Sequence, residues 1–141
     1  MRVTRIFMIP LLSLALLSCI TAQNTAEKTL IKSFNLQGND VVDLDLGSNV
    51  EIQQWNSPTL RIEMVVSLDN GSETMLKSLI KAGRYNPSAD ETTAGFKVFM
   101  PGLERQLMVR GQPLRDNISY IVSVPSDVLI AEDMAIADKN K

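Results

Sequence analysis

Apolar and polar residues alternate along several short segments of the chain, and the clearest alternation covers residues 60–68. Every second position there is apolar: Leu60, Ile62, Met64, Val66 and Leu68. Successive side chains of a β-strand point to opposite faces, so a period of two predicts a strand with one buried face. Residues 42–46 and 50–53 show the same period. Further short strands are predicted for the apolar segments at 96–100, 106–110, 118–124 and 128–130.

One segment between these strands has a helical period. Its apolar residues are three or four positions apart, at Met75, Leu76, Leu79 and Ile80. This spacing predicts an amphipathic helix over about 72–82, with Ser72 suited to cap its start and Gly83 to end it. The apolar face predicts that the helix lies on the sheet, with a partner-binding face as the alternative.

These elements predict a mainly β fold. The short alternating strands are expected in a β-solenoid-like or layered sheet arrangement with one amphipathic helix. Residues 1–22 are expected to form a signal peptide, residues 23–32 a polar tether, and residues 33–141 a single β-rich domain. The polar residues 86–95 are expected to form a loop.

The first residues have the pattern of a secretory signal peptide. Arg2 and Arg5 precede an apolar run over 6–17 that is too short to span a bilayer. Signal peptidase I would cleave after Ala22. The alternative is a lipobox ending at Cys19, which would make this cysteine the candidate lipidation site. Both routes predict export to the periplasm, outer membrane or cell surface, with membrane attachment only if Cys19 is lipidated.

Composition excludes several classes of function. The 141 residues carry a formal net charge of -2, with no histidine and one cysteine. Without histidine the chain cannot build a Ser-His-Asp or Cys-His catalytic centre. Its acidic balance argues against nucleic-acid binding, which depends on clustered lysine and arginine. Because Cys19 is the one cysteine, the domain beyond the leader must be held by its apolar core and not by disulfides.

Three acidic residues form the first candidate site. Asp43 and Asp45 are two residues apart on a predicted strand, so their carboxylates share a face at about 7 Å. Glu51 could approach them from the next strand. This spacing suits a calcium ion or the carboxylate pair of a glycosidase. It is also typical of the solvated face of a half-buried strand, which is our prediction. We therefore expect no catalytic, cofactor-binding or metal-ligating residue.

Other conspicuous side chains also have two interpretations. Trp55 could stack on a sugar, but a tryptophan at a strand end more often closes a core. Arg84 and Tyr85 could form an anion-binding rim. The alternative is that Tyr85 packs on the sheet while Arg84 meets the last carbonyls of the helix. Three arginines at five-residue spacing do not share a strand face and are expected to be dispersed on the surface: Arg105, Arg110 and Arg115.

The order of these features resembles a known group of proteins. The chain resembles exported proteins of the Bacteroidetes type that are related to the auto-transporter adhesin head domain. The resemblance covers about Ser33 to Ile130 and rests on three segments: Val50-Glu51-Ile52-Gln53-Gln54-Trp55, Gly83-Arg84-Tyr85 and 118–125. The resemblance implies a repetitive β architecture, often a β-solenoid, at the cell surface or in the periplasm, without a known catalytic site. Relatives continue with further strands, so we expect that the chain is truncated at its C-terminus.

These observations predict a non-enzymatic exported protein with a scaffolding or adhesion role at the cell envelope. Its expected partner is an envelope or surface component of unknown identity, and self-association through edge strands is a further expectation. The alternative is a periplasmic or outer-membrane lipoprotein that binds a ligand or accompanies an envelope sensor. A third alternative is a carbohydrate-active enzyme that uses Asp43, Asp45 or Glu51.

Processing of the leader can be tested by metabolic labelling with palmitate in a Gram-negative bacterium. We expect cleavage after Ala22, so the exported protein should begin at Gln23 and carry no label. Cys19→Ala is the matched control and should leave export unchanged. Label that disappears in Cys19→Ala would establish lipoprotein processing instead.

Overall fold

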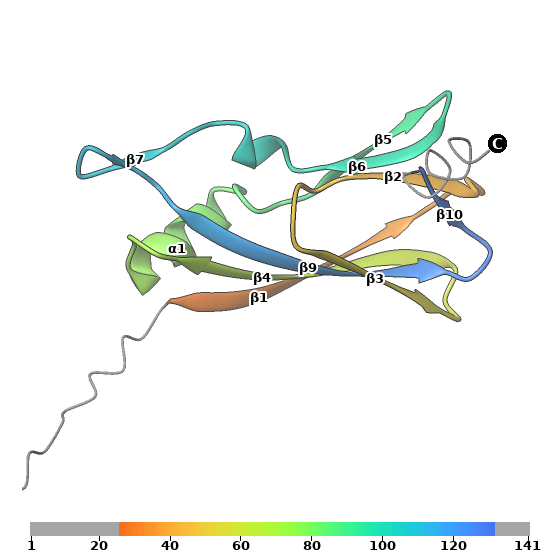
Figure 1. The fold of residues 1–141 in the computed structure, drawn as a ribbon, viewed down its shortest axis with the longest axis horizontal. Coiled ribbons are helices and arrows are strands. Elements are labelled where there is room, and N and C mark those ends of the chain that lie inside the picture. Colours follow the sequence, from red (N-terminus) through yellow and green to blue (C-terminus); the bar gives the residue numbers. More distant parts are fainter. Residues whose placement is uncertain (1–25, 132–141) are drawn as a thin grey trace, which may run out of the picture.

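The computed structural model describes residues 26–131, which form two facing four-stranded sheets and a two-stranded hairpin (Figure 1). Sheet A has the strand order β1 (Glu27–Asn35), β4 (Thr59–Leu68), β9 (Asp116–Pro125) and β3 (Val50–Trp55). Sheet B has the order β10 (Leu129–Ile130), β2 (Val41–Asp45), β6 (Gly95–Phe99) and β5 (Ser88–Thr92). The remaining elements are α1 (Glu73–Lys81), the short 3-10 helix η1 (Pro101–Leu103), and the hairpin of β7 (Met108–Val109) and β8 (Gln112–Pro113).

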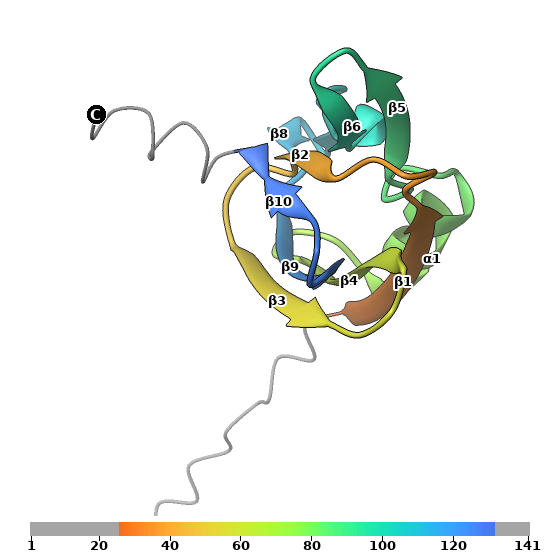
Figure 2. The ribbon, with the colours of Figure 1, turned by 90° about the vertical axis from the view of Figure 1, so that its right-hand side faces the viewer.

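The two sheets mix parallel and antiparallel pairs. In sheet A, β4 pairs antiparallel with β1 and β9, whereas β3 runs parallel to β9. In sheet B, β2 runs parallel to β6 and β10, and β5 pairs antiparallel with β6. The end view shows the sheets as two layers (Figure 2). The predicted mainly β class with one amphipathic α-helix is confirmed in its layered form, and the solenoid arrangement is not confirmed.

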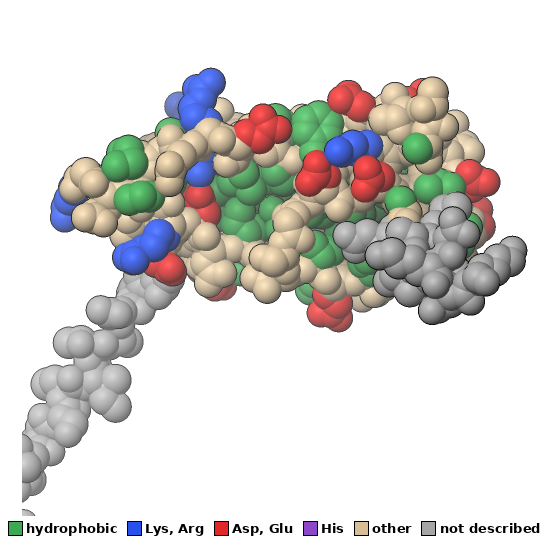
Figure 3. Space-filling model, turned by 45° about the horizontal axis from the view of Figure 1, so that its top comes forward, with side chains coloured by type: hydrophobic (Ala, Val, Ile, Leu, Met, Phe, Trp, Pro, Cys, Tyr) green, Lys and Arg blue, Asp and Glu red, His purple; other side chains and the backbone are tan. Residues whose placement is uncertain are grey.

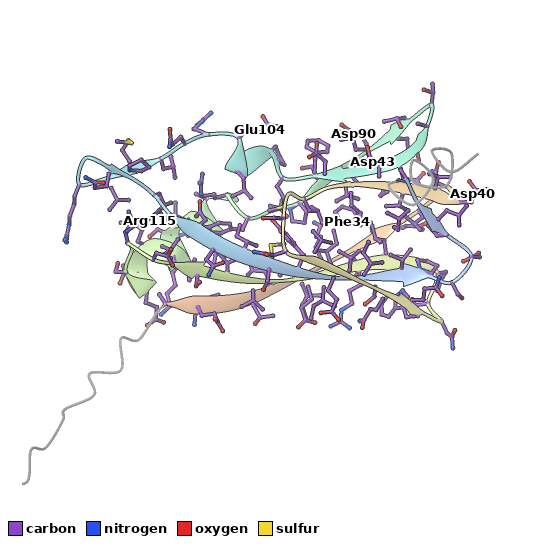
Figure 4. All side chains as sticks on the ribbon, in the orientation of Figure 1. Phe34, Asp40, Asp43, Asp90, Glu104 and Arg115 are labelled. Carbon is purple, nitrogen blue, oxygen red and sulfur yellow. The ribbon has the colours of Figure 1, made fainter. Side chains whose placement is uncertain are left out.

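The apolar core lies between the inner faces of the sheets. Strand β4 supplies a row of side chains that are at most 2% exposed: Leu60, Ile62, Met64, Val66 and Leu68. Val42 and Val98 of sheet B face this row and are fully buried. Phe34 of β1 lies between the layers (Figure 4) and meets Phe96 of β6 edge to face, with ring centroids 6.1 Å apart. The alternation predicted for residues 60–68 is therefore confirmed.

Helix α1 packs against this core at one end of the molecule. The Ser72 hydroxyl accepts a hydrogen bond from the Met75 amide at 3.2 Å, as predicted for the cap. Leu76 is fully buried, and the other apolar residues of the predicted stripe are partly buried against the core. Gly83 follows with φ of 81°, a conformation that glycine adopts without strain. The prediction that the helix lies on the sheet is confirmed.

Two segments that were expected to lack regular structure are strands. The expected polar tether over 23–32 is wrong from Glu27 onward, because those residues belong to β1; residues 23–25 lie outside the described range. Only Leu30 and Phe34 of β1 pack against the core. Lys32 lies between them on the same face, so this edge strand shows little hydrophobic period. The expected loop over 86–95 contains β5, and the strand expected over 106–110 is reduced to β7.

Two isoleucines on the paired strands β4 and β1 of sheet A test how far the core stabilises the domain. Ile62 is fully buried, whereas Ile31 is 57% exposed. We expect Ile62→Ala to lower the free energy of unfolding by about 2–5 kcal/mol, since it removes buried methyl groups and leaves a cavity. Ile31→Ala should change it by less than about 0.5 kcal/mol. Urea denaturation followed by circular dichroism measures both, and equal effects would contradict the described core.

Candidate functional site

The three acidic residues of the candidate site do not come together. Asp43 and Asp45 lie on β2 in sheet B, whereas Glu51 lies on β3 in sheet A, so the predicted approach of Glu51 from the neighbouring strand is wrong. Asp45 Oδ2 lies 3.0 Å from Lys97 Nζ on the adjacent strand. The pKa of Lys97 is raised, chiefly by its hydrogen bond and charge interaction with Asp45.

Asp43 and Asp90 lie on the outer side of sheet B (Figure 4), where acidic side chains surround a basic one (Figure 3). Both residues are in register with Lys97, which lies between them on β6. Within residues 26–131, no three acidic or other ligating side chains are grouped closely enough to hold a metal ion. The arrangement is that of a solvated strand face with opposite charges on neighbouring strands.

Trp55 ends β3 and is half-buried. Its indole Nε1 donates to the Thr59 carbonyl at 2.9 Å, and the Arg61 guanidinium lies 6.0 Å from the ring centroid. The side chain therefore closes the turn between β3 and β4. The arginines at 105, 110 and 115 belong to the segment around the β7–β8 hairpin, and Figure 4 shows Arg115 at this end of the molecule.

The most buried charged group in the described part of the chain is the Arg84–Asp116 pair. Arg84 Nη2 and Asp116 Oδ2 are 2.6 Å apart, and their side chains are 8% and 13% exposed. The Tyr85 hydroxyl donates to the other oxygen of Asp116. Arg84 Nη1 also donates to the carbonyls of Gly102 and Arg105, at 2.9 and 2.8 Å. The Arg84 backbone amide donates to the Leu79 carbonyl in the last turn of α1 at 3.1 Å, but the guanidinium does not bond the last carbonyls of the helix as expected.

Hydrogen bonding and burial favour the protonated forms of Arg84 and Tyr85. The pKa of Arg84 is raised, first by its hydrogen bond to Asp116. The pKa of Tyr85 is raised strongly, first by burial and then by its hydrogen bond to the same carboxylate. These side chains satisfy one another's hydrogen-bonding groups. They connect three segments: the residues after α1, the region of η1, and the start of β9. The cluster acts as a structural clamp, because both carboxylate oxygens of Asp116 and three nitrogens of Arg84 are already bonded.

Sequence reasoning identified Arg84 and Tyr85 but missed Asp116. This aspartate lies in a polar stretch, thirty-two residues from Arg84 along the chain. No local pattern reports a pairing over that distance. A useful signal was the position of Asp116 at the start of a strongly apolar strand, where an unpaired carboxylate would be costly to bury.

Tyr120 is a second buried tyrosine and differs from Tyr85 in its polar contacts. It is 2% exposed, and its hydroxyl is buried without a hydrogen-bond partner among residues 26–131. Burial, with a smaller contribution from Asp116, raises the pKa of Tyr120 to about 12. The hydroxyl therefore loses water contacts on folding without replacing them.

The two tyrosines make a matched pair for mutagenesis. We expect Tyr120→Phe to raise the free energy of unfolding by about 1 kcal/mol, because it removes an unsatisfied buried hydroxyl. Tyr85→Phe should lower it by about 1.5–3 kcal/mol, because it removes a hydrogen bond to a buried carboxylate. Urea titrations of both variants beside the wild type give the comparison. Destabilisation of similar size in the two variants would contradict these assignments.

The outer edges of the two sheets carry exposed apolar side chains. Sheet A ends at β1 and β3, and sheet B ends at β10 and β5. Four large apolar side chains are exposed in the described residues, and three of them lie on these edge strands: Ile31 on β1 at 57%, Ile52 on β3 at 45%, and Leu129 on β10 at 57%. The fourth is Met108 on β7. Unpaired strand edges with apolar side chains are typical sites of association with another chain.

A groove lies beside one of these edges. This β1–α1 groove has a volume of about 380 Å³ and runs between β1, the end of α1 and the segment that leads to β5. Its lining residues are Leu30, Ile31, Lys32, Met64, Ile80, Lys81, Gly83, Tyr85, Asn86 and Pro87. The lining combines apolar and polar surface and contains two lysines and no acidic residue.

Comparisons with known proteins add no family assignment. No family model, curated protein or solved structure matches the chain. The resemblance to the adhesin head domain group therefore stays a prediction. No helix within residues 26–131 is long and apolar enough to cross a membrane. The sheet edges and the β1–α1 groove are consequently the candidate functional site on geometry alone.

Proposed function

We propose that the protein is a non-catalytic, exported component of the cell envelope that scaffolds or adheres through the edges of its β-sheets. The observation that carries this proposal is the position of the exposed apolar side chains. Three of the four in the described residues lie on edge strands, one each on β1, β3 and β10. Edges of this kind offer main-chain hydrogen bonds and apolar contact at the same place.

Strand β3 illustrates why these edges favour association. Its six residues, Val50–Trp55, include one charged side chain, Glu51, and no lysine or proline. Lysine, proline and bulges are the usual means by which proteins prevent edge-to-edge pairing. In addition, Ile52 exposes 45% of its surface beside this edge. A partner strand would bury that side chain and pair the open edge.

The carboxylates of Asp116 and Asp45 support a non-catalytic role because both are bonded to neighbouring side chains. Asp116 is engaged by Arg84 and Tyr85, and Asp45 is paired with Lys97. A general acid or base needs a carboxylate with access to substrate and a suitably shifted pKa. The Asp116 carboxylate has both oxygens occupied. The proposed location rests on the leader pattern of residues 1–22.

The test is co-sedimentation of the purified protein with cell envelopes of the bacterium that encodes it. The triple variant Ile31→Lys, Ile52→Lys, Leu129→Lys places a charge on three edges without touching the core, and we expect it to lower the bound fraction about tenfold. Met108→Lys is the matched control, because Met108 is equally exposed but lies on the hairpin. Its bound fraction should equal that of the wild type.

Two outcomes would contradict the proposal. Equal sedimentation of the triple variant and the wild type would show that the edges do not carry binding. Hydrolysis of an envelope polysaccharide that is lost in Asp45→Asn would establish the carbohydrate-active alternative.

A further inference from the structure

We propose that the β1–α1 groove binds an extended peptide segment of a partner protein, which adds to sheet A as a strand beside β1. The segment would place an apolar side chain in the groove and an acidic side chain near Lys32 and Lys81. This inference deepens the proposed function, on which it rests, by naming the edge that is used and the chemistry of its partner.

The main chain of β1 leaves a free row of hydrogen-bonding groups. The Leu68 amide donates to the Ala26 carbonyl, and the register continues from this pair with Glu27 opposite Ser67. Antiparallel ladders alternate, so the even-numbered residues of β1 exchange hydrogen bonds with β4. The amides and carbonyls of Thr29, Ile31 and Ser33 then point away from β4. An extended peptide can pair with them without disturbing sheet A.

The groove lies beside this free row and suits an apolar side chain. Leu30, Met64, Ile80 and Tyr85 supply apolar surface, and all four belong to or pack against the core. Leu30 and Lys32 alternate with Ile31 along β1, so they lie on the groove side of the sheet. Alternate residues of an added strand would lie on that side too. The volume of about 380 Å³ leaves room for a leucine or phenylalanine side chain.

The charge of the groove indicates which further side chain the peptide should carry. Lys32 and Lys81 line the groove, and neither forms an ion pair with another of residues 26–131. Lys28 on the same strand differs, because its Nζ lies 3.6 Å from Glu73 Oε1. An acidic side chain two positions from the apolar one, on the same face of the added strand, would complement the two lysines. A fatty acid would satisfy the lysines and the apolar lining but not the main chain of Ile31, so the open edge favours a peptide.

The probe is a nine-residue peptide with fluorescein at its N-terminus, built from threonine and valine, with leucine at its centre and a glutamate two positions before and two positions after the leucine, so that the three side chains share one face of the strand. Fluorescence anisotropy with the full exported protein measures its affinity. We expect the double variant Lys32→Glu, Lys81→Glu to weaken binding about tenfold or more, because it replaces attraction by repulsion. Arg110→Glu is the matched control, since it makes the same change of sign at an exposed position on the β7–β8 turn. It should leave binding unchanged.

A second pair of measurements tests strand addition independently of the lysines. The same peptide with N-methyl groups on alternate residues cannot pair with an edge, and we expect it to bind at least about tenfold more weakly. Ile31→Pro removes the outward amide of β1 and should have the same effect on the unmodified peptide. Circular dichroism shows whether this variant is folded. The N-methylated peptide is measured with the wild-type protein, so that test does not depend on the folding of a variant.

Several outcomes would overturn the inference. Equal binding of the two peptides would exclude strand addition. Sodium dodecanoate that binds in the groove while the peptide does not would identify an anionic amphiphile as the ligand. Dimerisation in analytical ultracentrifugation that is lost in the double lysine variant would identify a second copy as the occupant. Wild-type protein that binds no peptide but keeps its edge-dependent sedimentation would refute the groove assignment and leave the proposed function intact.

Discussion

Burial of the apolar layer between the two sheets is the interaction on which the rest of the structure depends. Residues 26–131 contain no cysteine, so no covalent crosslink assists the fold. Strand β4 contributes a continuous inner row, and Phe34 and Phe96 join the layers by a direct aromatic contact. A domain of this size reaches only modest stability from a single core. The same core holds the edge strands β1, β3, β5 and β10 in place, so a partner can contact them without a rearrangement of the fold.

The Asp116 carboxylate connects several segments at one end of the domain through its bonds to Arg84 and Tyr85. Breaking a buried ion pair leaves an uncompensated charge, so the pair resists separation even where it adds little net stability. Here the pair connects three elements: the residues after α1, η1 and the start of β9. Tyr85 lies both in this cluster and in the lining of the β1–α1 groove. The clamp thus sets the position of the groove wall opposite β1.

Particular elements show what the sequence can predict. Strand β4 and helix α1 were predictable because each buries one full face, which imposes a period of two or of three to four. Strands β1 and β5 were not, because each is an edge with charged residues that hides few side chains. The separation of Glu51 from Asp43 depends on which sheet each strand joins, and the partner of Arg84 depends on a contact between distant segments. Neither leaves a local periodicity, so the clamp, the groove and the free edge of β1 required the three-dimensional structure.

The position of β9 in sheet A affects how the domain can be assembled. This strand lies between β4 and β3 in space but follows both by about fifty residues or more in the chain. Loop closure over such separations slows folding, and one edge of β4 stays unpaired until β9 arrives. A growing polypeptide therefore cannot complete sheet A before residues 116–125 have been synthesised. Until then, the β4 edge that pairs with β9 is open to contact with other strands.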